Sequence, residues 1–174
     1  MEHHLFDDSD KELRVRPAKI EDASAITRLS TQELPLSDAA RFAAQRIVEE
    51  RLGIASGDDY FTIVAERKPS AEIVGWLTGG GCRGQEFKGW GELYALSSEQ
   101  FATNIEIDEA LLGVALHALE AARFSGVTIL LERADSIRRE LLEDLGFIAE
   151  HDDTDNEPAM RDVLIRYSFE FAAS

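Results

Sequence analysis

The chain has 174 residues, 44% of them hydrophobic, so it is long enough to bury one core of ordinary size and short for two. Its 34 Asp and Glu against 18 Lys and Arg give a formal net charge of −16 at pH 7. Nucleic acids repel such a charge and require a basic surface, whereas Arg138 and Arg139 are set among acidic residues. The composition therefore excludes nucleic acid as a partner.

The sequence also argues against membranes and metals. It has no run of about 18 apolar residues that could cross a bilayer, and residues 1–4 lack the basic and then apolar pattern of an export signal. A single cysteine, Cys82, has no partner at metal-ligand spacing. We expect a cytoplasmic protein with no membrane contact, no disulfide and no metal.

The polarity pattern predicts one domain of alternating strands and helices. Residues 1–12 contain five Asp or Glu and predict a flexible acidic segment, and the domain follows at 13–171. The expected elements, in chain order, are a strand at 13–18, a helix from 21 through 29, a helix after 34–35, strands at 60–66, 72–77 and 90–96, a helix at 108–125, a strand at 127–132, a helix at 136–145, and strands at 147–148 and 163–171.

Three local features refine these boundaries. Ser37 is expected to cap the second helix, whose predicted buried stripe is Phe42, Ile47, Val48 and Leu52. The run Gly79–Gly81 has no basic or hydroxyl residue at the spacing of a phosphate loop, so it predicts a hairpin tip. Gly126 is expected to end the helix at 108–125.

The order of elements places the chain in the α/β (α+β) class, with a mixed sheet covered by helices on both faces. Four segments carry a more specific pattern. They are Arg14-Val15-Arg16-Pro17-Ala18 with Asp22-Ala23; Val64-Ala65-Glu66 followed by Ile73-Val74-Gly75-Trp76; Glu92-Leu93-Tyr94-Ala95-Leu96 followed by Ala110-Leu111-Leu112; and Leu145-Gly146-Phe147.

In this order the segments resemble the GNAT superfamily of acyl-CoA N-acyltransferases over residues 13–169. The resemblance implies a GNAT fold with a central sheet of six to seven strands flanked by about four helices. It also implies acetyl-CoA as cofactor and an acceptor that is a small amine or a protein amine. Many members dimerise, so a homodimer is a further expectation.

The family's cofactor loop departs from its usual form here. In the family, glycines in Arg/Gln-x-x-Gly-x-Gly/Ala let backbone N–H groups reach the CoA pyrophosphate at the start of a helix. The corresponding residues 103–108 contain no glycine, and Glu106, Asp108 and Glu109 bring carboxylates that repel a phosphate. Thr103 and Glu106 instead match a capping box, which would satisfy the helix start internally. Backbone contacts to the cofactor are implied at Leu96, Ser98 and Ile107.

Amine acylation needs a base for the incoming ammonium and often an acid for the departing thiolate. Glu92 lies on the strand where relatives carry a base, and is the candidate for that role. The family's tyrosine acid corresponds to Leu142 in this chain, with Tyr94 and Tyr167 as alternatives. His117 lies off the apolar stripe of its helix, and is expected in solvent.

Three functions remain open from the sequence. The first is an N-acetyltransferase for a cationic amine, which the acidic composition would attract. The second is a degenerate GNAT domain that has lost acetyl-CoA and acts as a binding or regulatory protein, because both the phosphate loop and the tyrosine are replaced. The third is a structural partner that dimerises through the edge of its sheet.

Overall fold

The computed structural model describes residues 13–54, 60–99, 105–150 and 164–172. The predictions for residues 1–12 and for the Thr103 cap lie outside these ranges. The elements are β1 Leu13–Pro17, the 3-10 turn η2 Ile20–Asp22, α1 Ala23–Ser30, α2 Asp38–Ile54, β2 Tyr60–Arg67, β3 Glu72–Gly81, the 3-10 turn η3 Gln85–Phe87, β4 Gly91–Ser98, α3 Ile105–Ala121, β5 Gly126–Glu132, α4 Ser136–Asp144, β6 Ile148–Ala149 and β7 Leu164–Glu170.

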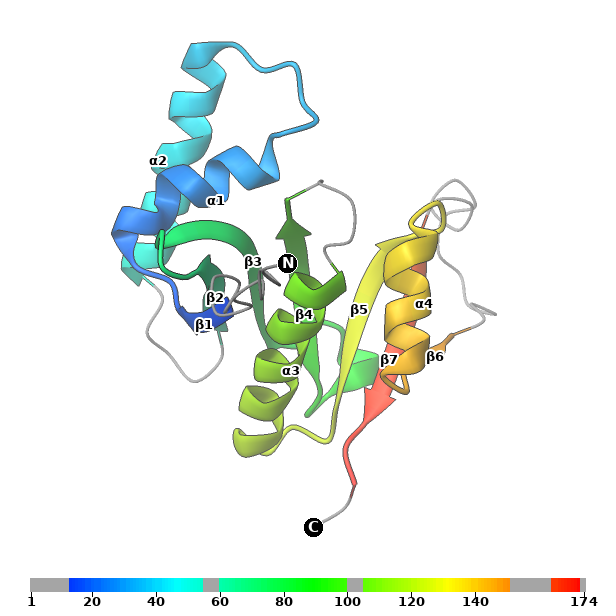
Figure 1. Ribbon diagram of the computed structural model, residues 1–174. Coiled ribbons are helices and arrows are strands. Elements are labelled where there is room, and N and C mark those ends of the chain that lie inside the picture. The colour runs from blue at the N-terminus through cyan, green and yellow to red at the C-terminus, as the bar shows by residue number, and fades with distance from the viewer. Residues whose placement is uncertain (1–12, 55–59, 100–104, 151–163, 173–174) are drawn as a thin grey trace, which may run out of the picture.

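The strands form one seven-stranded sheet in the order β1-β2-β3-β4-β5-β7-β6 (Figure 1). Neighbouring strands are antiparallel except β4 and β5, which run parallel. A parallel pair needs a crossover, and α3 supplies it between β4 and β5. The predicted mixed sheet of six to seven strands with about four helices is confirmed.

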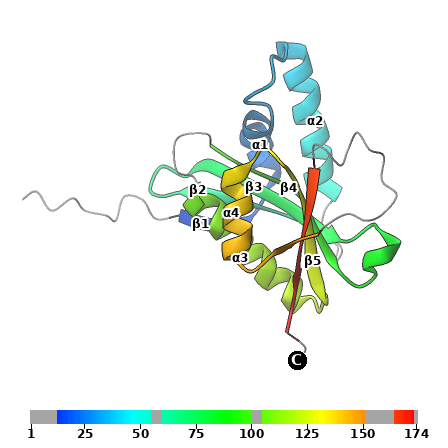
Figure 2. The ribbon, with the colours of Figure 1, turned by 90° about the vertical axis from the view of Figure 1, so that its right-hand side faces the viewer.

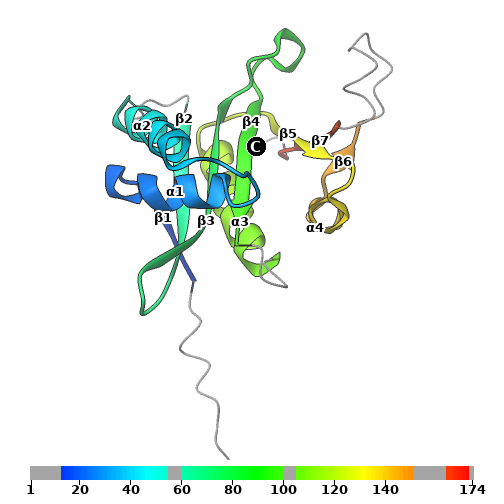
Figure 3. The ribbon, with the colours of Figure 1, turned by 90° about the horizontal axis from the view of Figure 1, so that it is seen from above.

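Helices cover both faces of the sheet, as the view from above shows (Figure 3). On one face α3, over the centre of the sheet, and α4, beside it toward β6, bury an apolar stripe, and on the other face α1 packs against β2 and β3. The first stripe consists of Leu111, Leu112, Ala115 and Leu119 from α3 with Leu141 and Leu142 from α4. This spacing of three and four residues is what places them on one side of each helix.

The second helix is less buried than its pattern predicts. Ser37 caps it as expected, since its hydroxyl oxygen accepts a hydrogen bond from the N–H of Ala40 at 3.3 Å. Val48 and Leu52 are partly buried, but Phe42 and Ile47 are 67% and 53% exposed, so the predicted stripe is wrong at these two positions. The reason is that α2 packs mainly on α1 and extends away from the sheet (Figure 2).

Two predictions about glycines are also wrong. Gly79–Gly81 do not form a hairpin tip, because β3 continues through them and pairs them with Leu93, Glu92 and Gly91 of β4. A Cβ atom at Gly79 would lie 2.9 Å from the carbonyl oxygen of Glu92, so close strand approach explains the glycine. Gly126 does not end α3, which stops at Ala121 and is followed by Arg123 at φ 63°.

Gly126 instead begins β5 in a crowded position, and an alanine there should be destabilising. Its Cβ atom would lie 2.5 Å from Trp90 Cζ3 and 2.6 Å from the carbonyl oxygen of Phe169 on β7. Since the carbonyl belongs to a paired strand, Gly126→Ala should lower the unfolding free energy by about 2 kcal/mol in urea titration. The control is Gly113→Ala on α3, where nothing lies within 4 Å and a small gain is expected. Equal stability of the two variants would contradict the prediction.

Candidate functional site

The sheet opens between its two parallel strands. β4 and β5 pair only at Gly91 with Val127, Glu92 with Thr128 and Leu93 with Ile129. Both strands continue beyond these pairs, and Figure 1 shows them diverging. A pocket of about 520 Å³ lies in the gap, with residues 93–96 of β4 and 129–132 of β5 as its walls. This volume is within the range of small-molecule sites.

Backbone groups of β4 face this gap. The N–H of Glu99 donates to the carbonyl oxygen of Val74 at 2.9 Å, and hydrogen-bonded pairs alternate along an antiparallel ladder. Leu96 and Ser98 therefore direct their N–H and C=O groups away from β3. The Ser98 carbonyl oxygen accepts from Gln32 Nε2 at 3.1 Å, which agrees with this direction. At Leu96, which lines the pocket, the edge of β4 thus offers a backbone N–H and C=O to a ligand in the gap, whereas at Ser98 the carbonyl oxygen already has Gln32 as a partner.

The pocket is acidic on balance. Its described lining residues include Glu33 after α1, Glu132 at the end of β5 and Asp135 before α4, and Arg138 is the one basic residue among them. Three carboxylates against one guanidinium give the lining a formal charge of −2. Such a site favours a cationic ligand.

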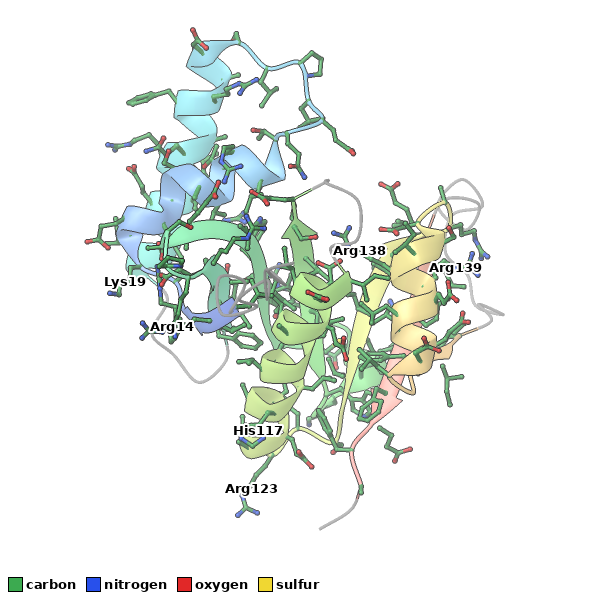
Figure 4. The ribbon with its side chains drawn as sticks, in the orientation of Figure 1. Arg14, Lys19, His117, Arg123, Arg138 and Arg139 are labelled. Atoms are coloured by element: carbon green, nitrogen blue, oxygen red, sulfur yellow. The ribbon has the colours of Figure 1, made fainter. Side chains whose placement is uncertain are left out.

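Arg138 ties the two walls of the site together, and Figure 4 shows its side chain between α4 and the gap. Its Nε bonds Asp108 Oδ2 of α3 at 2.8 Å, its Nη1 bonds Asp135 Oδ2 at 3.2 Å, and its Nη2 bonds Ser98 Oγ at 3.4 Å. Burial lowers the pKa of Arg138, but Asp108 and then Asp135 more than offset this, so the pKa is raised. The guanidinium is charged and held by two carboxylates.

This ion pair corrects the prediction of three free carboxylates at the start of α3. Asp108 is 5% exposed and its charge is matched by Arg138, whereas Glu106 and Glu109 are exposed. Ile107 is the third residue of α3, so its N–H belongs to the first turn, where such groups lack partners within the helix. Its side chain is buried against β3. The repulsion expected for a phosphate is therefore smaller than the sequence alone indicates.

Glu92 lies at the closed end of the gap rather than among the residues that line the pocket. It is half-buried, and its Oε2 accepts a hydrogen bond from the N–H of Arg83 at 3.4 Å. Its parallel pair with Thr128 is the last but one before the strands separate.

Burial raises the pKa of the Cys82 thiol, and the nearby Glu92 carboxylate raises it further, so Cys82 stays protonated at neutral pH.

Tyr94 lines the pocket beside an irregularity in β4. The register between β3 and β4 shifts so that Tyr94 is the extra residue on β4. Its hydroxyl donates to the Gly81 carbonyl oxygen, and the Arg83 guanidinium lies 4.6 Å from its ring centre. Burial raises the pKa of Tyr94, and Arg83 offsets this in part. Its proton is engaged with the backbone in this arrangement.

The other candidates for an acid lie away from the gap. Tyr167 is fully buried, and its hydroxyl donates to Glu143 Oε1 at 2.8 Å and accepts from Arg139 Nε at 3.1 Å. Leu142 is buried in the core. His117 is exposed near the end of α3, as expected (Figure 4). Tyr167 and Leu142 thus serve the core of the protein.

The described residues contain neither a candidate metal centre nor a candidate membrane span. No group of three or more His, Cys, Asp or Glu is placed there to hold a metal ion. No helix in the same part of the chain has the length and apolarity needed to cross a membrane.

The sequence analysis missed Arg138 and Asp135 as site residues. In the sequence, the acidic neighbours of Arg138 indicate only that it belongs to no basic cluster. Its main partner Asp108 is 30 positions away. A partial signal was present, because Asp135 precedes the predicted helix at 136–145 and its side chain accepts from the N–H of Arg138. Nothing local indicates the pairing across helices.

Comparisons with known proteins agree with this geometry. No protein-family model matches the sequence, and no curated protein matches it. Solved structures do match: the GNAT acetyltransferase from Streptococcus pneumoniae has a TM-score of 0.66 at 16% identity, covering 92% of this chain and 100% of that one. PaiA N-acetyltransferase from Thermoplasma acidophilum, in complex with coenzyme A, has a TM-score of 0.64 at 16% identity, covering 92% and 99%.

Ribosomal-protein-alanine N-acetyltransferase from Brucella melitensis matches in the same way, with a TM-score of 0.65 at 16% identity, covering 91% of this chain and 99% of that one. At this level of identity, the matches show the fold alone. The likeness extends over nearly the full length of both chains. The chain therefore has the GNAT fold.

Proposed function

We propose that this protein transfers an acyl group from an acyl-pantetheine thioester, such as acetyl-CoA, to the nitrogen of a cationic amine. The observation that carries the proposal is the pocket between β4 and β5, where backbone groups of Leu96 and Ser98 face the gap. A pantetheine arm carries two amides, and these can form hydrogen bonds with such an edge as the backbone of a short added strand would. The donor supplies an activated thioester carbonyl.

The chain's own groups account for the other requirements. Glu33, Glu132 and Asp135 attract an ammonium to the pocket. Glu92 accepts the proton that the ammonium must lose before its nitrogen can form the C–N bond. The C–S bond breaks in the same transfer, and the leaving sulfur takes up a proton. The acceptor is a small amine or an amine on a protein.

A second candidate function is a binding domain of the same fold that has lost the donor. The observations in its favour are the carboxylates in the first turn of α3 and the buried Leu142 in place of a tyrosine acid.

Association of two copies through a sheet edge, which here means β1 or β6, stays a prediction.

Thermal unfolding with and without millimolar acetyl-CoA tests the proposal. Ligand at about a hundred times its dissociation constant should add about 2.7 kcal/mol to the unfolding free energy. We expect a clear rise in Tm with acetyl-CoA, and amine-dependent release of CoA with at least one cationic amine of a panel. Absence of both effects would contradict the transferase proposal and favour the binding domain.

A further inference from the structure

The ion pair between Asp108 and Arg138 has no role in the transfer proposed above. Arg138 is the one basic residue among the described residues that line the pocket. Any anionic group of a ligand in the pocket would be drawn to it. Yet its Nε and Nη1 already bond Asp108 at 2.8 Å and Asp135 at 3.2 Å, so two carboxylates compete for it.

The hydrogen bonding of the Asp108 carboxylate is incomplete, which is unusual for a purely structural residue. Its side chain is 7% exposed, and its Oδ1 is buried without a hydrogen-bond partner among the described residues. A buried oxygen without a partner is unfavourable. Among the described residues, the hydrogen bond from Arg138 to Oδ2 is therefore the one that offsets the cost of burying this carboxylate. Within the part of the chain that the structure describes, the side-chain hydrogen bond of the Asp108 carboxylate is thus the one to Arg138, the cation of the pocket.

The position of Arg138 decides which part of a donor it would meet. Leu96 and then Ser98 direct their backbone groups to the side of β4 away from β3, where the Ser98 carbonyl oxygen accepts from Gln32, and Ser98 Oγ lies 3.4 Å from Arg138 Nη2. A pantetheine arm on this edge, with its phosphate end at Ser98, would bring that phosphate to Arg138. The phosphate would then compete with the Asp108 carboxylate.

We infer that Asp108 is an internal counter-ion that occupies Arg138 and makes the protein select its donor by the acyl-pantetheine arm rather than by the phosphate. This inference rests on the proposed function. The donor class is then acyl-pantetheine thioesters in general, with little gain from phosphorylation. Asp108 and Arg138 act as specificity-determining residues.

Binding of two donors that differ by one phosphate tests this inference: S-acetyl-pantetheine and S-acetyl-4′-phosphopantetheine, measured by calorimetry. For the unmodified protein we expect affinities that agree within about threefold, because the carboxylate offsets the guanidinium. In Asp108→Asn the guanidinium keeps Asp135 as its one carboxylate partner among the described residues, and the phosphorylated donor should bind about tenfold more tightly than the other. In Asp108→Asn with Arg138→Gln this preference should disappear.

The matched control is Asp144→Asn, which removes an exposed carboxylate at the last residue of α4 and should leave the ratio of affinities unchanged. A preference above tenfold for the phosphorylated donor in the unmodified protein overturns the inference, and this holds even if no variant folds. An unchanged ratio in folded Asp108→Asn overturns it as well. Failure of both donors to bind any form overturns the proposed function, and this inference with it.

Discussion

Glu92→Gln should lower kcat for amine acylation by about 100-fold, at the lower end of the range for loss of a general base. The glutamine amide keeps the shape of the side chain and can still accept from the N–H of Arg83, but it cannot take a proton from an ammonium. Donor binding should change by less than about twofold, since Glu92 lies outside the pocket lining. Steady-state kinetics with the amine varied at saturating acetyl-CoA gives kcat, and calorimetry with acetyl-CoA gives the affinity for the donor.

The control for Glu92→Gln is Glu120→Gln, an exposed residue near the end of α3 that also removes one negative charge. Its kcat should equal that of the unmodified protein. If Glu92→Gln keeps kcat within threefold while donor binding is normal, another group accepts the proton. Glu132, a carboxylate that lines the pocket, would then be the next residue to test.

Asp22→Ala should lower the unfolding free energy by about 3 kcal/mol at pH 7, because it removes one partner of a largely buried ion pair. The Asp22 carboxylate is 9% exposed and accepts from Arg16 Nη1 at 2.7 Å, from Arg16 Nη2 at 2.9 Å and from the N–H of Lys19 at 2.8 Å. Arg16 also bonds Glu66 of β2 at 2.8 Å, so the cluster joins β1, the η2 turn and β2. Removing Asp22 leaves the partly buried Arg16 with one carboxylate partner, Glu66.

Urea titration measures this loss, and Glu21→Ala is the matched control. Glu21 lies in the same η2 turn but is exposed, so its removal should change the unfolding free energy by less than about 0.5 kcal/mol. A loss below about 1 kcal/mol for Asp22→Ala would mean that the Arg16 cluster contributes little to the fold.

The same carboxylate makes a prediction about pH. Burial raises the pKa of Asp22, but the Arg16 guanidinium and the Lys19 N–H more than offset this, so the pKa lies below its ordinary value. A lowered pKa stabilises the fold at pH above the unfolded value of about 3.9 and loses this contribution as pH falls through the folded value. The stability difference between the unmodified protein and Asp22→Asn should therefore be constant from pH 5 to pH 7 and shrink below about pH 4.

The sequence by itself determined the order of elements and the buried face of the main helix. Of the apolar positions at helical spacing, Leu111, Leu112, Ala115 and Leu119 are buried and Leu116 is partly buried, whereas Ala122 lies past the end of α3 and is exposed. The alternating strands at 60–66 and 72–77 were located correctly, because period-two polarity is a local property. The GNAT resemblance rests on such local segments in a given order, and it correctly indicated the fold.

Only the tertiary structure decided the character of the site. Asp108 was expected to repel a phosphate, but it is paired with Arg138 on another helix, and no local pattern encodes a contact over 30 residues. The end of pairing at Leu93 and Ile129 depends on how two strands diverge in space. The exposure of Phe42 depends on what α2 packs against. Periodicity specifies which side of an element is apolar, whereas partners, gaps and ion pairs arise only when distant elements meet.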